Sequence, residues 1–159
     1  MNIFALDQDP QLSAEMHNDK HVVKMILEYA QILSTTHRLL DGDKDILYKA
    51  THKNHPSTVW ARQSTANYKW LHKLWVCLSN EYTHRYDKTH LSYTKLKDIL
   101  NTPPSNLQEG PLTSVSQAMP EEYKNSLDHI KAYRDYYIGE KQALAKWTKR
   151  DVPLWYLFK

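Results

Sequence analysis

Polar side chains recur every three or four positions between residues 17 and 35, and they carry functional groups suited to chemistry. Residues at this spacing share one face of a helix, so the segment would present a cationic groove that holds a single carboxylate. Such a groove suits an anionic ligand whose reacting centre needs a base or a charge stabiliser, and Glu28 would be that group. The alternative is a solvated helix face on which Lys24 and Glu28 form an i,i+4 ion pair. The stripe consists of His17, Lys20, His21, Lys24, Glu28, Gln31 and Thr35.

A second polar cluster, His52, Asn54 and His55, precedes a helix start and is followed by Trp60 and Arg62. If it faces the stripe, the cluster adds imidazole donors, an amide that can hydrogen-bond to base edges, and an aromatic face. It also adds a guanidinium that can bind a phosphate through two hydrogen bonds. We therefore expect one pocket in which the stripe points toward the turn of the second cluster. The alternative is a capped helix start that carries surface histidines.

A basic and aromatic patch lies near the C-terminal end of the chain. It predicts contact with nucleic-acid phosphates, and the alternative is a positively charged helix end favoured by the helix dipole. The patch consists of Lys141, Lys146, Trp147, Lys149, Arg150 and Trp155.

No metal site and no cofactor are predicted. His17 and His21 are spaced like the two histidines of a zinc-protease helix, but Asn18 stands where that motif has its glutamate. With only three glycines, the chain lacks the glycine-rich loops that bind dinucleotides and triphosphates. The single cysteine, Cys77, excludes an intrachain disulfide, and its apolar neighbours indicate an inert thiol.

Periodicity predicts an all-α, single-domain protein over residues 1–159, a compact bundle of four to five helices. Four prolines and a glycine mark a long irregular loop near residues 101–120, and the apolar tail is expected to pack back on the bundle. Helices are expected from Gln11 to Leu40 with a start signal at Ser13, from Ser57 or Thr58 to about Tyr86, from Lys88 to Leu100, and from Pro120 or Ser126 to about Trp147.

Net charge and hydropathy limit the classes of partner that the protein is expected to bind. With 21 basic and 18 acidic residues the formal net charge is +3, which permits an anionic partner such as DNA or a nucleotide. Because the chain has no run of about 18 apolar residues, we expect no membrane partner and a cytoplasmic location. These features leave the oligomeric state open.

Several short motifs resemble the pyrimidine-dimer DNA glycosylase family, which includes a phage endonuclease V and bacterial relatives. The run Asp19-Lys20-His21, with Glu28 seven residues after the histidine, is similar to the first helix of that family. The Asn54-His55-Pro56 turn resembles that of the bacterial relatives. The helix end Glu81–Tyr86 and the aromatic tail Lys146–Tyr156 also look like theirs. Leu27 is a departure, because the family has an arginine just before its glutamate.

The resemblance implies a small all-helical enzyme that flips a nucleotide and attacks the sugar C1′ with its N-terminal α-amine. The first-helix glutamate of the family stabilises the resulting iminium, and this role carries over to Glu28. Because Asn2 is a large second residue, Met1 is expected to be retained and the amine would be that of Met1.

The sequence thus predicts a DNA glycosylase-like enzyme, of phage type, that acts at the N-glycosidic bond of a flipped or modified nucleotide. Its catalytic residues would be Glu28 and His21. Two alternatives stay open: a phage protein that sequesters a host nucleotide signal without turnover, and an interaction protein whose polar stripe is only solvated. The residues expected to bind substrate are His17, Lys20, Lys24, His52, Asn54, His55, Trp60, Arg62, Lys146 and Arg150.

Overall fold

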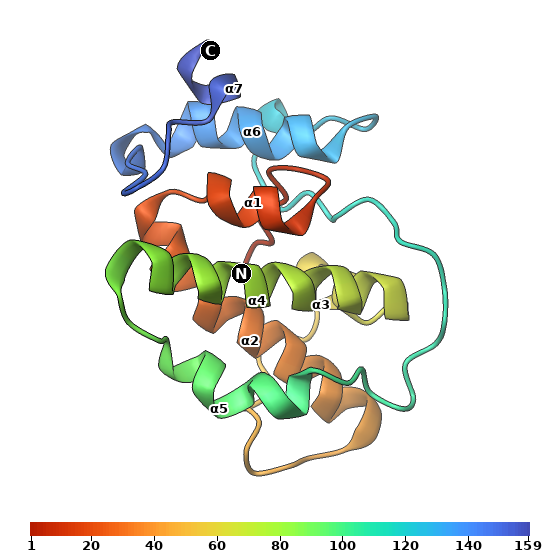
Figure 1. Ribbon diagram of the computed structural model, residues 1–159. Helices are drawn as coiled ribbons and strands as arrows, with labels where there is room; N and C mark the ends of the chain where they lie inside the picture. Colours follow the sequence, from red (N-terminus) through yellow and green to blue (C-terminus); the bar gives the residue numbers. More distant parts are fainter.

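The computed structural model describes residues 1–159 and is entirely helical, which confirms the predicted fold class (Figure 1). It contains seven α-helices instead of four to five, because two of the four predicted helices are each broken in two and the tail forms one further short helix. The α-helices are α1 (Pro10–Met16), α2 (Asp19–Asp41), α3 (Pro56–Ala61), α4 (Thr65–Tyr86), α5 (Leu91–Leu100), α6 (His129–Glu140) and α7 (Leu154–Leu157), with short 3₁₀ turns η1 (Glu121–Tyr123) and η2 (Gln142–Leu144).

The predicted first helix breaks at His17 and Asn18, both of which have extended backbone conformations. The Asn18 side chain accepts a hydrogen bond from the backbone N–H of His21 at 2.9 Å and so starts α2 as its N-cap. The start signal assigned to Ser13 is wrong, because Asp9 caps α1 and Ser13 lies within the helix. The capping side chain of Asn18 thus divides the predicted helix into two, although the apolar periodicity continues through the break.

The predicted second helix also breaks, between Ala61 and Thr65. His55 caps α3, in place of Ser57 or Thr58, and Ser64 caps α4 by accepting a hydrogen bond from the backbone N–H of Asn67 at 3.1 Å. Each new cap satisfies a backbone donor that the broken helix leaves unpaired.

The C-terminal third is less helical than the sequence suggests. Residues 101–120 are irregular as expected, but α6 begins only at His129 and ends at Glu140, well short of Trp147. The tail does pack back in part, because Trp147 and Tyr156 are buried, whereas Leu154 and Phe158 are exposed.

Helix α4 lies at the centre of the molecule and packs against α1, α2, α3 and α5, while α6 and α7 pack together at one end (Figure 1). One cluster of 30 buried hydrophobic residues forms the core, and it includes Trp60, Trp75 and Tyr68. None of the helices is both long enough and apolar enough to cross a membrane.

The N-terminal segment from Ile3 to Leu6 is fully buried although it belongs to no helix. Its backbone polar groups therefore need partners inside the core. Ser13 supplies two, since its hydroxyl accepts from the Leu6 N–H and donates to the Phe4 carbonyl, both at 3.0 Å. The Tyr29 hydroxyl supplies the third by accepting from the Phe4 N–H at 3.0 Å.

His17 completes this set of hydrogen bonds. Its Nδ1–H donates to the Ser13 carbonyl at 2.7 Å, so that Nε2 is left to accept from the Tyr29 hydroxyl at 2.8 Å. Both ring nitrogens of a neutral imidazole are thereby satisfied. The pKa of His17 is lowered to about 3, mainly by burial and to a smaller extent by the charge of Arg85. The hydrogen bond to Ser13 acts in the opposite direction and raises the pKa.

We expect the free energy of unfolding to fall as the pH drops below about 6.5, because the unfolded chain takes up protons that the buried His17 and His21 rings refuse. Burial lowers their folded-state pKa values from 6.5 to about 3 and about 2. Each ring then removes up to about 1.4 kcal/mol per pH unit across that window. Urea titrations between about pH 7 and about pH 5 measure this slope. A free energy of unfolding that stays constant across the window would contradict the expectation.

The substitution Tyr29→Phe tests the anchoring of the N-terminal segment. Loss of the hydroxyl leaves the Phe4 N–H and His17 Nε2 buried without their partner, so we expect a loss of about 1–3 kcal/mol in the free energy of unfolding. Urea denaturation gives the value. The matched control is Tyr82→Phe at a partly buried tyrosine, which we expect to cost much less. Equal losses at the two positions would show that the Tyr29 hydroxyl does not anchor the segment.

Candidate functional site

The α-amine of Met1 and the carboxylate of Glu28 meet in a cavity of about 170 Å³. Three parts of the chain build it: the buried N-terminal segment, one face of α2, and the residue that ends α6. Because α2 is a regular helix, His21, Lys24 and Glu28 face the cavity together, as their spacing predicts. The lining residues are Met1, Asn2, Phe4, His21, Lys24, Met25, Glu28 and Lys141.

Glu28 lies between two amines. Its Oε1 is 3.4 Å from the Met1 nitrogen and its Oε2 is 3.6 Å from Lys24 Nζ. The Met1 and Glu28 side chains are only 5% and 15% exposed, so the pair is largely withdrawn from bulk water. Oε2 accepts no hydrogen bond from the protein although it is buried. The carboxylate therefore keeps one oxygen free to accept a proton from a group that enters the cavity.

His21 forms a rigid wall of the cavity. Its ring stacks on Phe4 with centroids 4.3 Å apart, and Nδ1 is 2.6 Å from the Tyr137 hydroxyl. Burial lowers the pKa of His21 to about 2, helped by the nearby charges of His17, Lys141, Lys24 and Lys20. The ring is therefore neutral at physiological pH and acts as a fixed polar group instead of a cation.

A larger groove of about 600 Å³ lies beside the cavity along α2. Lys20, Lys24 and Lys146 line it with positive charge, and Val23 and Tyr86 add apolar surface. We call this feature the lysine groove. Lys24 lines both the groove and the cavity, so the two are neighbours. A cationic groove with an aromatic side chain suits a sugar-phosphate backbone that carries exposed bases.

The residues of the second polar cluster, His52, Asn54 and His55, do not line the cavity. His55 Nδ1 accepts a hydrogen bond from the backbone N–H of Ser57 at 3.1 Å and caps α3. Burial lowers the pKa of His55, and the positive charge of the N-terminal amine contributes to the same shift. Asn54 is solvent-exposed, and His52 is also exposed with its ring 2.7 Å from the Thr51 hydroxyl.

Three other residues predicted to bind substrate lie away from the cavity. His17 is buried with both ring nitrogens bonded within the protein. Trp60 is buried in the core, where its ring meets the edge of Trp70 at a centroid distance of 6.2 Å. Arg62 ends α3 and is half-buried. Their positions in the sequence fit the predicted pocket, but the packing of the folded chain leaves all three side chains out of the cavity lining.

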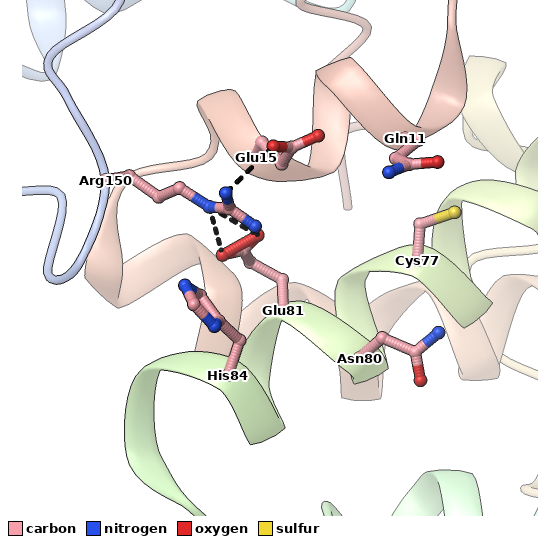
Figure 2. Close-up of a pocket in the computed structure, with 7 residues that line it drawn as sticks. All are labelled: Gln11, Glu15, Cys77, Asn80, Glu81, His84 and Arg150. Atoms are coloured by element: carbon pink, nitrogen blue, oxygen red, sulfur yellow. Dashed lines mark hydrogen bonds and ion pairs between the residues drawn. The ribbon is translucent and has the colours of Figure 1, made fainter.

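Arg150 lies in a separate polar pocket of about 300 Å³ between α1 and α4 (Figure 2). Its Nε and Nη2 donate to the Glu81 carboxylate at 2.9 and 3.1 Å, and its Nη1 is 3.1 Å from Glu15 Oε1. Figure 2 shows the guanidinium held between these two carboxylates, with Gln11 and Cys77 farther along the pocket. Its charge is thus balanced within the protein instead of being presented to a phosphate.

Sequence reasoning missed several residues of the cavity. Phe4 lines the cavity, and Tyr137 bonds to His21 beside it. Lys141 also lines the cavity, although its sequence position assigned it only to the basic patch. No local spacing connects these residues to Glu28. One signal was present, since the run Ile3-Phe4-Ala5-Leu6 is apolar enough to enter a core. Burial of that run is what brings the chain terminus to α2.

Comparison with known proteins found a family that matches the part of the chain that contains Met1 and Glu28. The model of a family described as pyrimidine dimer DNA glycosylase matches residues 1–94. No curated protein and no solved structure matches the chain. The matched segment covers more than half of the 159 residues and includes the N-terminal segment, α2 and the Asn54-His55-Pro56 turn, so the chain belongs to the pyrimidine dimer DNA glycosylase family.

Proposed function

We propose that this protein breaks the N-glycosidic bond of a damaged deoxynucleotide in DNA, with the Met1 α-amine as nucleophile and Glu28 as the assisting carboxylate. One observation carries the proposal: the Met1 nitrogen is 3.4 Å from Glu28 Oε1 in a cavity where both side chains are largely buried. A nucleophile beside a base is the arrangement that covalent catalysis requires. The family match over residues 1–94 supports the same class of reaction.

The reaction begins with a proton transfer. Glu28 takes a proton from the Met1 ammonium, which gives the amine a free electron pair. That pair bonds to C1′ of the deoxyribose while the C1′–N bond to the base breaks. The base leaves with the bonding electrons and takes up the proton that Glu28 had accepted, which restores the Glu28 carboxylate. Opening of the sugar ring, in which O4′ gains a proton, converts the adduct into an iminium whose positive charge the Glu28 carboxylate stabilises.

The proposed covalent adduct also predicts strand cleavage. The iminium makes the C2′ proton acidic, and loss of that proton expels the 3′ phosphate group by β-elimination. We assign receipt of this proton to Glu28 Oε2, which accepts no hydrogen bond from the protein. Water then hydrolyses the imine and restores the free amine of Met1.

Other side chains of the cavity hold the reacting groups in place. The neutral His21 ring, fixed by Phe4 and Tyr137, forms a wall against which the sugar can be oriented. Lys24 and Lys141 place positive charge at the cavity mouth, where a phosphate next to the reacting sugar would lie. The lysine groove continues this charge along α2 and is the proposed path of the damaged strand.

The first test is Glu28→Gln, which keeps the size of the side chain but removes its charge. We expect strand cleavage at a site-specific cyclobutane pyrimidine dimer in duplex DNA to fall by roughly a hundredfold or more, because proton transfer and iminium stabilisation are both lost. Binding to the same duplex is expected to persist. Lys131→Gln, at an exposed position of α6 that does not line the cavity, is the control for loss of a charged side chain. Full activity of Glu28→Gln would refute the proposed mechanism.

The second test identifies the nucleophile. Borohydride reduces an imine to a stable amine, so it should join protein and abasic DNA in an adduct that maps to the N-terminal peptide. Intact mass first establishes that Met1 carries a free α-amine, and selective acetylation of that amine is expected to abolish both the adduct and strand cleavage. An adduct that maps to Lys24 or Lys141 would contradict the assignment, and so would cleavage that survives acetylation.

A further inference from the structure

Arg150 lies in a short strap that crosses the junction between α1 and α2. The strap comprises residues Lys146 to Arg150 and has no regular secondary structure. We infer that Arg150 is a positioning residue: its ion pairs with Glu81 and Glu15 hold the strap so that Lys146 stands at the lysine groove. This inference rests on the proposed function, because it assigns the groove to the DNA backbone.

Asp19, the first residue of α2, anchors the first part of the strap, at Lys146 and Thr148. Its backbone N–H donates to the Lys146 carbonyl at 2.8 Å, and its carboxylate accepts from the Thr148 N–H and hydroxyl at 2.8 and 2.6 Å. The Trp147 indole N–H donates to the Met16 carbonyl at 2.7 Å. These bonds fix one end of the strap, beside the groove that Lys146 lines.

Arg150 fixes the other end on α4 and α1. Glu81, its main partner, is buried, and it also accepts from Arg85 Nε at 3.3 Å. A planar guanidinium that donates to both oxygens of a carboxylate is held in one orientation, which a lysine could not reproduce. The hydrogen bond to Glu81 raises the pKa of Arg150 further, so the anchor stays charged at any physiological pH.

The backbone between the Asp19 contacts and the Arg150 contacts is strained, so contacts on both sides are needed to hold its conformation. Lys149 has a φ of +59°, a left-handed conformation that a non-glycine residue adopts only at a cost. This cost is offset by the hydrogen bonds of Thr148 and Arg150 on either side of the residue and by Lys149 itself, whose Nζ donates to the His84 carbonyl at 3.2 Å. Release of Arg150 would let the turn relax, so that the Lys146 side chain would no longer be held in one position at the groove.

A double-mutant cycle tests the inference. Lys146→Gln, Arg150→Gln and the double variant are compared for binding to a duplex that carries a tetrahydrofuran abasic analogue, which cannot form an imine. We expect each single variant to raise Kd about fivefold and to reduce the slope of log K against log salt by about one unit, the signature of one lost phosphate contact. Because Arg150 acts through Lys146, the double variant should bind no more weakly than Lys146→Gln alone.

Three outcomes would overturn the inference. If Arg150→Gln leaves Kd unchanged while Lys146→Gln weakens binding, the strap does not depend on Arg150. If the two losses multiply in the double variant, Arg150 acts independently of Lys146. If Lys146→Gln has no effect, the lysine groove is not the DNA path; the Met1–Glu28 chemistry is then judged separately by the borohydride adduct. Lys131→Gln, which removes an exposed positive charge elsewhere, controls for net charge.

Loss of folding is distinguished from loss of position by the salt dependence. A variant that is only partly folded lowers the active fraction without changing the salt slope. Should Arg150→Gln fail to fold, Glu15→Gln removes one of the two partners and leaves the Glu81 contact in place. It is expected to weaken binding in the same direction by a smaller factor and to add nothing in combination with Lys146→Gln. An unchanged Kd for Glu15→Gln in that case would overturn the inference.

Discussion

The buried N-terminal segment is the constraint on which the candidate site depends. Residues Ile3 to Leu6 enter the core without a helix of their own, and their backbone groups are satisfied by Ser13 and Tyr29. A non-helical segment in an apolar core is stable only when such partners exist, because an unpaired buried amide costs about as much as several buried methylene groups contribute. The Met1 amine is held beside Glu28 as a consequence of this packing.

The break between α1 and α2 also positions Glu28 relative to the buried N-terminal segment. Because the chain is extended at His17 and Asn18, the two helices diverge and leave backbone carbonyls that no helix uses. The Arg85 guanidinium donates to two of these carbonyls, those of Glu15 and His17, both at 2.9 Å, and to Asp19 Oδ1 at 3.0 Å. A buried arginine with several partners thus fixes the angle at which α2 leaves α1, and with it the position of Glu28 relative to the N-terminal segment.

Charge is arranged differently inside the cavity and along the groove. In the cavity, the His21 imidazole is neutral because burial outweighs any gain from protonation, and Glu28 is balanced by two amines. Along the groove, three lysine side chains face solvent and have no carboxylate partner except where Lys24 reaches Glu28. This division fits the proposed function, in which a phosphate backbone is attracted over a broad surface and the reaction takes place in a small cavity with largely buried reacting groups.

The sequence by itself determined the helical class and the shared face of His21, Lys24 and Glu28, because helical periodicity is a local property. It also carried the short motifs by which the family is recognised. It did not determine that Met1 lies beside Glu28, that His17 is a core residue, or that Arg150 is bound by Glu81, 69 residues away in the chain. These facts depend on long-range packing, which decides whether a charged or aromatic side chain meets a partner or solvent. Residue type and spacing are the same in either case, so only the tertiary structure could separate the groups that face a ligand from those that hold the fold together.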